Sequence, residues 1–255
     1  MSDERKLAPE APPTLAERMR AATSARVAIG RIGSSIPTRA ALDFQLAHAR
    51  ARDAVHAQLD AGAYGSTLHG HPVLEVCSQA ADRGQYLMRP DLGRRLAPGM
   101  AERLSPHRSD LAIILADGLS ATAVRAHAAN LVGAILARAQ DWQVGPIIVA
   151  HQARVALADE IGEALKAKIS VILIGERPGL SAADSLSAYI TWQPRKGRLD
   201  SERNCISNIR PPHGWRIEDA AGEVLRIARA ARRIGCTGVG MIAEQSAHQG
   251  PVLEG

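Results

Sequence analysis

The first candidate for chemistry is a carboxylate that follows an apolar run. Residues 171–174 are uniformly apolar, and Glu176 is the first charged side chain after them. Turns at the carboxyl ends of buried strands are where open α/β sheets bind ligands. Glu176 could therefore accept a hydrogen bond from a ligand amide or amine, or form a surface ion pair with Arg177, and the residues leave both open. The turn lacks the Lys-Ser/Thr ending of a phosphate-binding loop, so a large neutral ligand is expected.

A serine follows another apolar run and could serve as a nucleophile. In the segment DGLSAT, Ser120 lies between the run at 111–116 and a helical segment. The nucleophile elbow of α/β hydrolases needs glycine two residues on either side of its serine. Gly118 meets this need, but Thr122 occupies the second position, where a β-branched side chain would crowd the turn. We predict a strand-to-helix connection with Ser120 near the helix N-terminus, and keep a stand-alone α/β hydrolase as an alternative.

Thiol and imidazole groups form no recognisable catalytic or metal site in the sequence. The cysteines are far apart and form no CxxC pair: Cys77, Cys205 and Cys236. A catalytic thiol needs a nearby base and a cationic setting, and nothing in the sequence fixes His213 beside Cys205. A structural or contact role is therefore predicted for Cys205. His69 and His71 lack a third ligand at metal-binding spacing, so no metal site is predicted.

Bulk composition indicates a globular chain with a basic balance. Its 255 residues are 46% hydrophobic and 22% charged, with a formal net charge of +5. Nucleic-acid binding is not expected, because the arginines alternate with acids along the helical segments and aromatic residues are only 3% of the chain. No signal peptide or membrane-length apolar run is present. With few cysteines and an odd number of them, a cytoplasmic location without membrane contact is predicted.

Strands and helices are expected to alternate from residue 110 onward. The apolar runs predict strands at 111–116, 146–150, 169–174 and 186–192. Helical periodicity predicts helices at 119–139, 155–168 and 217–234, followed by a helix stop at 235–240 that could lead into a last short strand. This alternation is typical of βαβ units and of a Rossmann-like parallel sheet covered on both faces.

The N-terminal part is expected to be helical. Residues 1–13 read as a disordered tail and 246–255 as a loose one, which leaves a helical region at 14–109 and a Rossmann-like domain at 110–245. Thr14 and Glu17 have the spacing of a capping box. Helices are predicted over 38–58, 72–81 and 98–104, and the charged, turn-rich segment 82–95 is predicted to be a contact surface.

Six segments, in one order and with coherent spacing, are similar to a known family. They are TRAALDFQLAHARARDAVH at 38–56, DRGQYLMRPDLGRRL at 82–96, DLAIILADGLSATAV at 110–124, RVALADEIGEALKAK at 154–168, VILIGERPGLSAADSLSAYITWQPR at 171–195 and CISNIRPP at 205–212. The chain thereby resembles the small (light) subunit of ethanolamine ammonia-lyase, an adenosylcobalamin-dependent enzyme. It departs from the expected pattern at Ala41, where a leucine would be expected, and in its short N-terminal tail.

The resemblance implies three cofactor-binding residues and no catalytic residue on this chain. By matched motif, the cobalamin contacts fall on Val155 in RVALADE, Glu176 in GERPGL and Cys205 in CISNI. The family binds its cofactor base-on, with dimethylbenzimidazole still on cobalt. The absence from this chain of the DxHxxG signature, which displaces that base in other enzymes, agrees with this.

The resemblance also implies a partner and a reaction. The family assembles six large and six small subunits, and the large subunit, a (β/α)8 barrel, carries the substrate and the catalytic groups. Homolysis of the Co–C bond gives an adenosyl radical that abstracts a substrate hydrogen, and ethanolamine becomes acetaldehyde and ammonia. Such systems are often packaged in a bacterial microcompartment. A corrinoid-binding module without a lyase partner is a second alternative.

Overall fold

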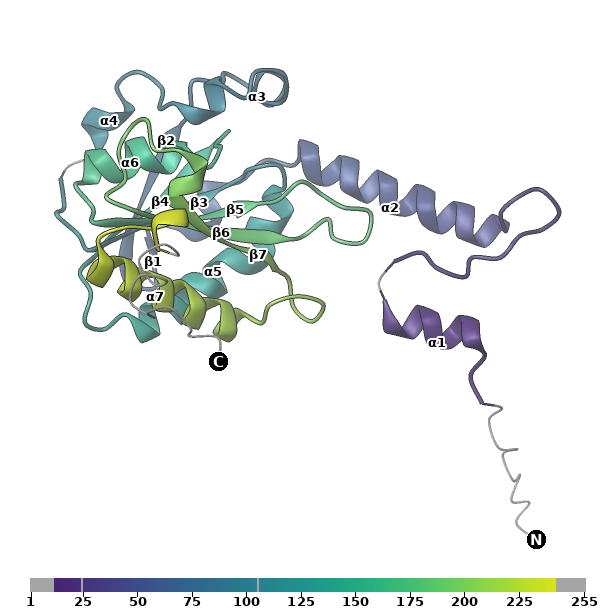
Figure 1. The fold of residues 1–255 in the computed structure, drawn as a ribbon. Helices are drawn as coiled ribbons and strands as arrows, with labels where there is room; N and C mark the ends of the chain where they lie inside the picture. Colours follow the sequence, from purple (N-terminus) through teal and green to yellow (C-terminus); the bar gives the residue numbers. More distant parts are fainter. Residues whose placement is uncertain (1–11, 24, 105, 242–255) are drawn as a thin grey trace, which may run out of the picture. The chain divides into compact units, whose positions relative to one another are not determined.

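The computed structural model describes residues 12–23, 25–104 and 106–241 (Figure 1). Most of the predicted N-terminal tail and all of the predicted C-terminal tail lie outside the described residues. The chain separates into two units, residues Met1–Ala49 and Arg50–Gly255. We call the described part of the first the N-terminal arm and that of the second the body, and describe each by itself.

The N-terminal arm is helical, as predicted. Helix α1 spans Leu15–Ala22, and α2 begins in the arm and spans Thr38–His56. The capping box is confirmed in both halves. The Glu17 amide donates to Thr14 Oγ1 at 3.3 Å, and the Thr14 amide donates to Glu17 Oε2 at 2.7 Å. These bonds satisfy main-chain amides at the helix N-terminus that have no partner within the helix.

The body is built on a mixed sheet in the order β1-β2-β4-β3-β5-β6-β7. Four neighbouring strands are parallel: β2 (His71–Cys77), β4 (Val144–His151), β3 (Leu111–Ala116) and β5 (Ile169–Gly175). Three further strands pair antiparallel at the two edges: β1 (Thr67–Leu68), β6 (Leu186–Trp192) and β7 (Arg203–Ile209). The expected α/β fold with a helical N-terminal region is confirmed.

Two expectations about strands were wrong. The helix predicted over 72–81 is absent, because 71–77 forms β2 and pairs in parallel with β4. The sheet is also not purely parallel, since the chain turns back after β5 into antiparallel β6 and β7. Strand β7 was not predicted. It is an edge strand in which only Arg203, Ile206 and Ile209 are buried, so its sequence shows little apolar alternation.

Helices cover both faces of the sheet, as Figure 1 shows. Helices α5 (Ala121–Arg138) and α7 (Ile217–Ile234) pack on one face, and α6 (Leu157–Leu165) packs on the other. Alternate residues of β3 face the two sides: Leu111, Ile113 and Leu115 pack toward α5 and α7, whereas Ala112, Ile114 and Ala116 pack toward α6. A strand buried on both sides explains the unbroken apolar run in its sequence.

The segment 82–95 contains two short helices, α3 (Arg83–Met88) and a 3₁₀ turn at Leu92–Arg94. A third short helix, α4 (Met100–Arg103), falls within the helix predicted at 98–104. Asp82 caps α3 by accepting a hydrogen bond from the Gln85 amide. Of the charged side chains in this segment, Asp82 caps a helix and Arg83 is buried, whereas the other four are exposed: Arg89, Asp91, Arg94 and Arg95.

A buried ion pair joins α6 to β7. Arg203 donates to both carboxylate oxygens of Asp159, at 2.6 and 2.7 Å, and also to the Thr191 hydroxyl at 3.2 Å. The Arg203 and Asp159 side chains are only 1% and 2% exposed. A bidentate pair is geometrically specific, and removing one partner leaves the other charge buried without compensation.

Two glycines allow the turn after β3 to lie against the end of β5. The Leu119 amide donates to the Gly175 carbonyl at 2.9 Å. Gly118 has a φ of +54°, and a Cβ on it would lie 2.3 Å from the Gly175 oxygen. A Cβ on Gly175 would lie 2.0 Å from the Ser120 carbonyl oxygen. Both distances are shorter than a real Cβ atom tolerates. The two turns can therefore lie in contact only because Gly118 and Gly175 have no side chain.

Asp159→Asn is expected to lower the free energy of unfolding by about 3 kcal/mol, because it removes the buried counter-charge of the Arg203 guanidinium and leaves only the exposed Asp200 carboxylate, 3.3 Å away, beside it. Urea unfolding followed by circular dichroism measures the loss. Asp91→Asn is the matched control, since the Arg89–Asp91 pair is exposed and should be worth less than about 1 kcal/mol. Equal losses in the two variants would contradict the structural role of Asp159.

Gly175→Ala is expected to lower the free energy of unfolding by at least about 2 kcal/mol, because the new methyl group overlaps the Ser120 main chain. Gly222→Ala on α7 provides the control, because a methyl group added there would meet no atom within 4 Å; alanine at this position should stabilise the helix by up to about 1 kcal/mol. The same urea titration compares them. A Gly175→Ala protein as stable as the wild type would show that the turns are not in close contact.

Candidate functional site

The carboxyl edge of the parallel strands contains a shallow cavity of about 270 Å³. The chain leaves β3 toward α5 on one face and leaves β4 toward α6 on the other, so the two loops diverge. Such a topological switch point is the usual ligand site of an open α/β sheet. The cavity is lined by the turns that follow β3, β4 and β5, by side chains of β6 and β7, and by Tyr86 of α3.

Glu176 is half-buried and lines this cavity. Its Oε1 accepts a hydrogen bond from the Asn208 amide at 3.0 Å and another from the Ser187 hydroxyl. No described residue donates a hydrogen bond to its Oε2, and no ion pair joins it to Arg177 within the described chain. One carboxylate oxygen is thus anchored to the strands, and the other can accept a hydrogen bond from a ligand.

Val155 lines the same cavity from the turn between β4 and α6. The turn is fixed by its neighbour Arg154, whose amide donates to the Gly93 carbonyl at 2.8 Å. The Arg154 guanidinium lies 4.4 Å from the centroid of the Tyr86 ring, a cation–π distance. The half-buried Val155 side chain therefore offers an apolar contact on a well-positioned turn.

Cys205 lies beside the cavity on β7. It is exposed and pairs in register with Tyr189, which lines the cavity. Desolvation by the neighbouring strands raises the pKa of the Cys205 thiol, and the Glu176 carboxylate acts in the same direction. The group is therefore a neutral thiol at physiological pH and a poor nucleophile.

Ser120 is fully buried and acts as the N-cap of α5, which confirms the strand-to-helix connection. Its Oγ accepts a hydrogen bond from the Ala123 amide at 3.2 Å and donates one to the Ala183 carbonyl at 2.7 Å. With its donor and an acceptor site both used and its surface covered, Ser120 has no nucleophilic geometry.

A buried network beneath the cavity was missed in the sequence. Asp117, only 1% exposed, accepts hydrogen bonds from the amides of Gln152 and Ala153 at 2.8 and 3.0 Å. Arg83 lies 3.6 Å from the Asp117 carboxylate and donates to the Gly118 carbonyl at 2.9 Å. These bonds tie α3 to the ends of β3 and β4. The one signal in the sequence was an aspartate directly after a buried strand.

The aromatic part of this network is Tyr86, which is fully buried between two arginines. Arg83 and Arg154 lie 4.8 and 4.4 Å from its ring centroid, and its hydroxyl donates to the Ala153 carbonyl at 3.0 Å. Burial raises the pKa of Tyr86, so its hydroxyl remains a donor. Through Arg83 and Tyr86, the segment 82–95 therefore stabilises the turns that line the cavity. Its exposed residues, such as Met88 at 77% exposure, still fit the predicted contact surface.

The two histidines of the HGH segment bind main-chain carbonyls. His69 Nε2 lies 2.9 Å from the Ala129 oxygen, and His71 Nδ1 lies 3.2 Å from the Gly145 oxygen. Among the described residues, no three histidine, cysteine or acidic side chains gather as metal ligands. In the same part of the chain, no helix is long and apolar enough to cross a membrane.

Comparison with known proteins identifies the family. The family model of the ethanolamine ammonia-lyase light chain matches residues 14–241. The chain is 47% identical to an ethanolamine ammonia-lyase small subunit of Ralstonia nicotianae, with 100% of this chain and 97% of the relative covered. It is 50% identical to that of Pseudomonas aeruginosa over 88% of this chain and 85% of the relative. For Bradyrhizobium diazoefficiens the identity is 49%, over 91% and 92%. The chain belongs to the ethanolamine ammonia-lyase light-chain family.

Proposed function

We propose that the chain is the small subunit of an adenosylcobalamin-dependent ethanolamine ammonia-lyase and forms one wall of its cobalamin site. The large subunit supplies the other wall and the catalytic groups. The observation that carries the proposal is the convergence of three residues at one sheet edge. Val155 and Glu176 line a single cavity, and Cys205 adjoins it through Tyr189.

The size of the cavity fits one wall of a shared site. Pockets that enclose a drug-sized ligand have volumes of roughly 300–1,000 Å³. The cavity of about 270 Å³ is smaller, and a corrinoid is larger than most drugs. Only one edge of a corrin could enter it, which leaves the rest of the cofactor to a partner.

The chemistry of the lining also fits a corrin. The corrin edge carries neutral amides, which can donate to the Glu176 Oε2 that no described residue occupies. Val155 offers apolar contact, and the neutral Cys205 thiol adds no charge beside it. Arg154 Nε is buried without a hydrogen-bond partner among the described residues, so the edge also contains a donor whose partner is missing. The three residues thus offer one carboxylate acceptor, one apolar contact and one neutral thiol to the edge of the corrin.

In this proposal the bound cofactor supplies the radical that abstracts hydrogen from ethanolamine, and acetaldehyde and ammonia are the products. The residues of this chain bind and orient the cofactor edge, and none is assigned a catalytic role. The cofactor is proposed to bind base-on, and the assembly to contain six large and six small chains. The assembly is proposed to lie in the cytoplasm, either free or packaged in a bacterial microcompartment.

Ammonia release is expected only from the two purified chains together with added adenosylcobalamin. Each chain alone should release none, because substrate groups and cofactor wall lie on different chains. Ser120→Ala in the pair should keep full activity while losing about 1 kcal/mol of stability from the cap of α5. Ammonia is measured by an enzyme-coupled assay. If this chain alone hydrolysed activated esters and Ser120→Ala abolished it, the hydrolase alternative would replace the proposal.

Glu176→Gln is expected to weaken cobalamin binding to the two-chain complex by roughly 10- to 100-fold, since a hydrogen bond to a charged acceptor contributes about 1.5–3 kcal/mol. The glutamine can still accept from Ser187 and Asn208 through one oxygen, so assembly should be unchanged. An absorbance titration measures the affinity, and size-exclusion chromatography the assembly. Glu102→Ala, in the exposed first turn of α4, is the control. Unchanged affinity in Glu176→Gln would remove Glu176 from the site.

A further inference from the structure

The N-terminal arm has no core of its own. None of its described residues, 12–23 and 25–49, is buried. Eight of the thirteen exposed large apolar side chains of the described chain lie in it. They are Leu15, Met19, Ile29, Ile32, Ile36, Leu42, Phe44 and Leu46. Most helical stability in proteins comes from burying an apolar face, and a dense set of exposed apolar side chains marks an interaction site.

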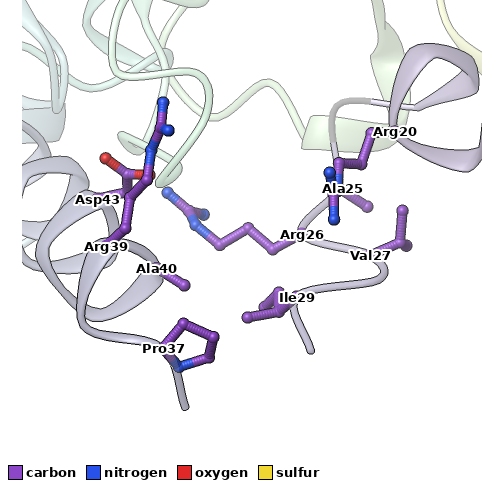
Figure 2. Close-up of a pocket in the computed structure, with 9 residues that line it drawn as sticks. All are labelled: Arg20, Ala25, Arg26, Val27, Ile29, Pro37, Arg39, Ala40 and Asp43. Atoms are coloured by element: carbon purple, nitrogen blue, oxygen red, sulfur yellow. The ribbon is translucent and has the colours of Figure 1, made fainter. Parts of the chain in front are cut away.

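Within the arm, the segment after α1 and the start of α2 enclose a cavity of about 510 Å³ (Figure 2). Its apolar lining comes from Val27, Ile29, Pro37 and Ala40. Figure 2 shows Ile29, Pro37 and Ala40 gathered together, with Arg26 extending from the first segment toward α2. All lining residues belong to the arm. The cavity could therefore receive an apolar side chain of a binding partner.

The charge around this cavity favours an acidic partner. Three arginines line it, Arg20, Arg26 and Arg39, against a single acid, Asp43. Arg20 donates to the Ala28 carbonyl at 2.8 Å. Arg39 makes no hydrogen bond or ion pair with any residue that the structure describes, so its charge is available to a partner. Residues 14–49 contain five arginines and two acids, a net charge of +3.

We propose that the N-terminal arm docks on the large subunit, with an acidic and apolar segment of that subunit in the arginine-lined cavity. A carboxylate of the segment would pair with Arg39 while an apolar side chain packs on Ile29 and Pro37. A second copy of the arm fits less well, because two arms of charge +3 would bring arginines together. This inference rests on the proposed function, which supplies the large subunit.

The test compares charge reversals inside and outside the cavity in the full-length chain. Arg39→Glu should weaken binding to the purified large subunit at least tenfold, because it places a carboxylate against the acidic segment. Arg31→Glu makes the same change in the same arm, but Arg31 does not line the cavity, and the loss should be twofold or less. Biolayer interferometry measures both affinities. Circular dichroism and the unfolding midpoint of each variant should match the wild type, since the arm lacks a core.

A second substitution tests the apolar half of the cavity. Ile29→Ser should weaken binding at least fivefold, whereas Ile32→Ser, more exposed and outside the cavity lining, should change it by twofold or less. A separate hydrogen-exchange measurement on the wild-type chain should show protection of residues 25–43 when the large subunit is added.

Equal affinities for Arg39→Glu and Arg31→Glu would overturn the docking proposal while leaving the proposed function intact. So would a wild-type chain that self-associates in a way Arg39→Glu abolishes without changing large-subunit binding, since the occupant would then be a second copy. A wild-type chain that binds no large subunit at all would instead contradict the proposed function itself.

Discussion

The candidate site depends on one close contact between main chains, where the turn after β3 meets the end of β5. Gly118 and Gly175 permit this contact, and the Leu119 amide closes it by donating to the Gly175 carbonyl. Glu176 follows Gly175 directly, so the contact also sets where the carboxylate leaves the sheet. On the β4 side of the cavity, the Asp117 carboxylate accepts hydrogen bonds from the main-chain amides of Gln152 and Ala153, which come just before Val155. The proposed cofactor residues are thus positioned by hydrogen bonds that involve the main chain, and not by contacts with one another.

The polar groups at this edge lack the features of a self-sufficient active site. Cys205 is a neutral thiol without a described base, Ser120 is a helix cap, and Glu176 has one oxygen tied to the strands. Each is explained if the edge is a binding wall whose catalytic groups belong to another chain. The N-terminal arm also lacks a self-contained core, since none of its described residues is buried within it.

Much of this architecture could be predicted from the sequence, above all for the strands that are buried on both faces of the sheet. The apolar runs of β3, β4 and β5 and the period of α7 carry strong signals, because burial demands uniform or periodic apolarity. Strand β7 and helix α3 could not be predicted in this way. The strand lies at an edge with most side chains polar, and α3 is short and held by tertiary bonds of Arg83 and Tyr86. Glu176 was identifiable as the first charge beyond a buried strand, whereas the partnership of Asp117 with Arg83 joins residues 34 positions apart and gave no local signal.

In the proposed function, cobalamin binds between this chain and the large subunit. An absorbance titration of adenosylcobalamin into this chain alone, the large subunit alone and the assembled pair tests it most directly. The pair is expected to bind the cofactor at least a hundredfold more tightly than either chain alone. A chain that alone bound cobalamin as tightly as the pair would contradict a shared site and would favour a corrinoid-binding module.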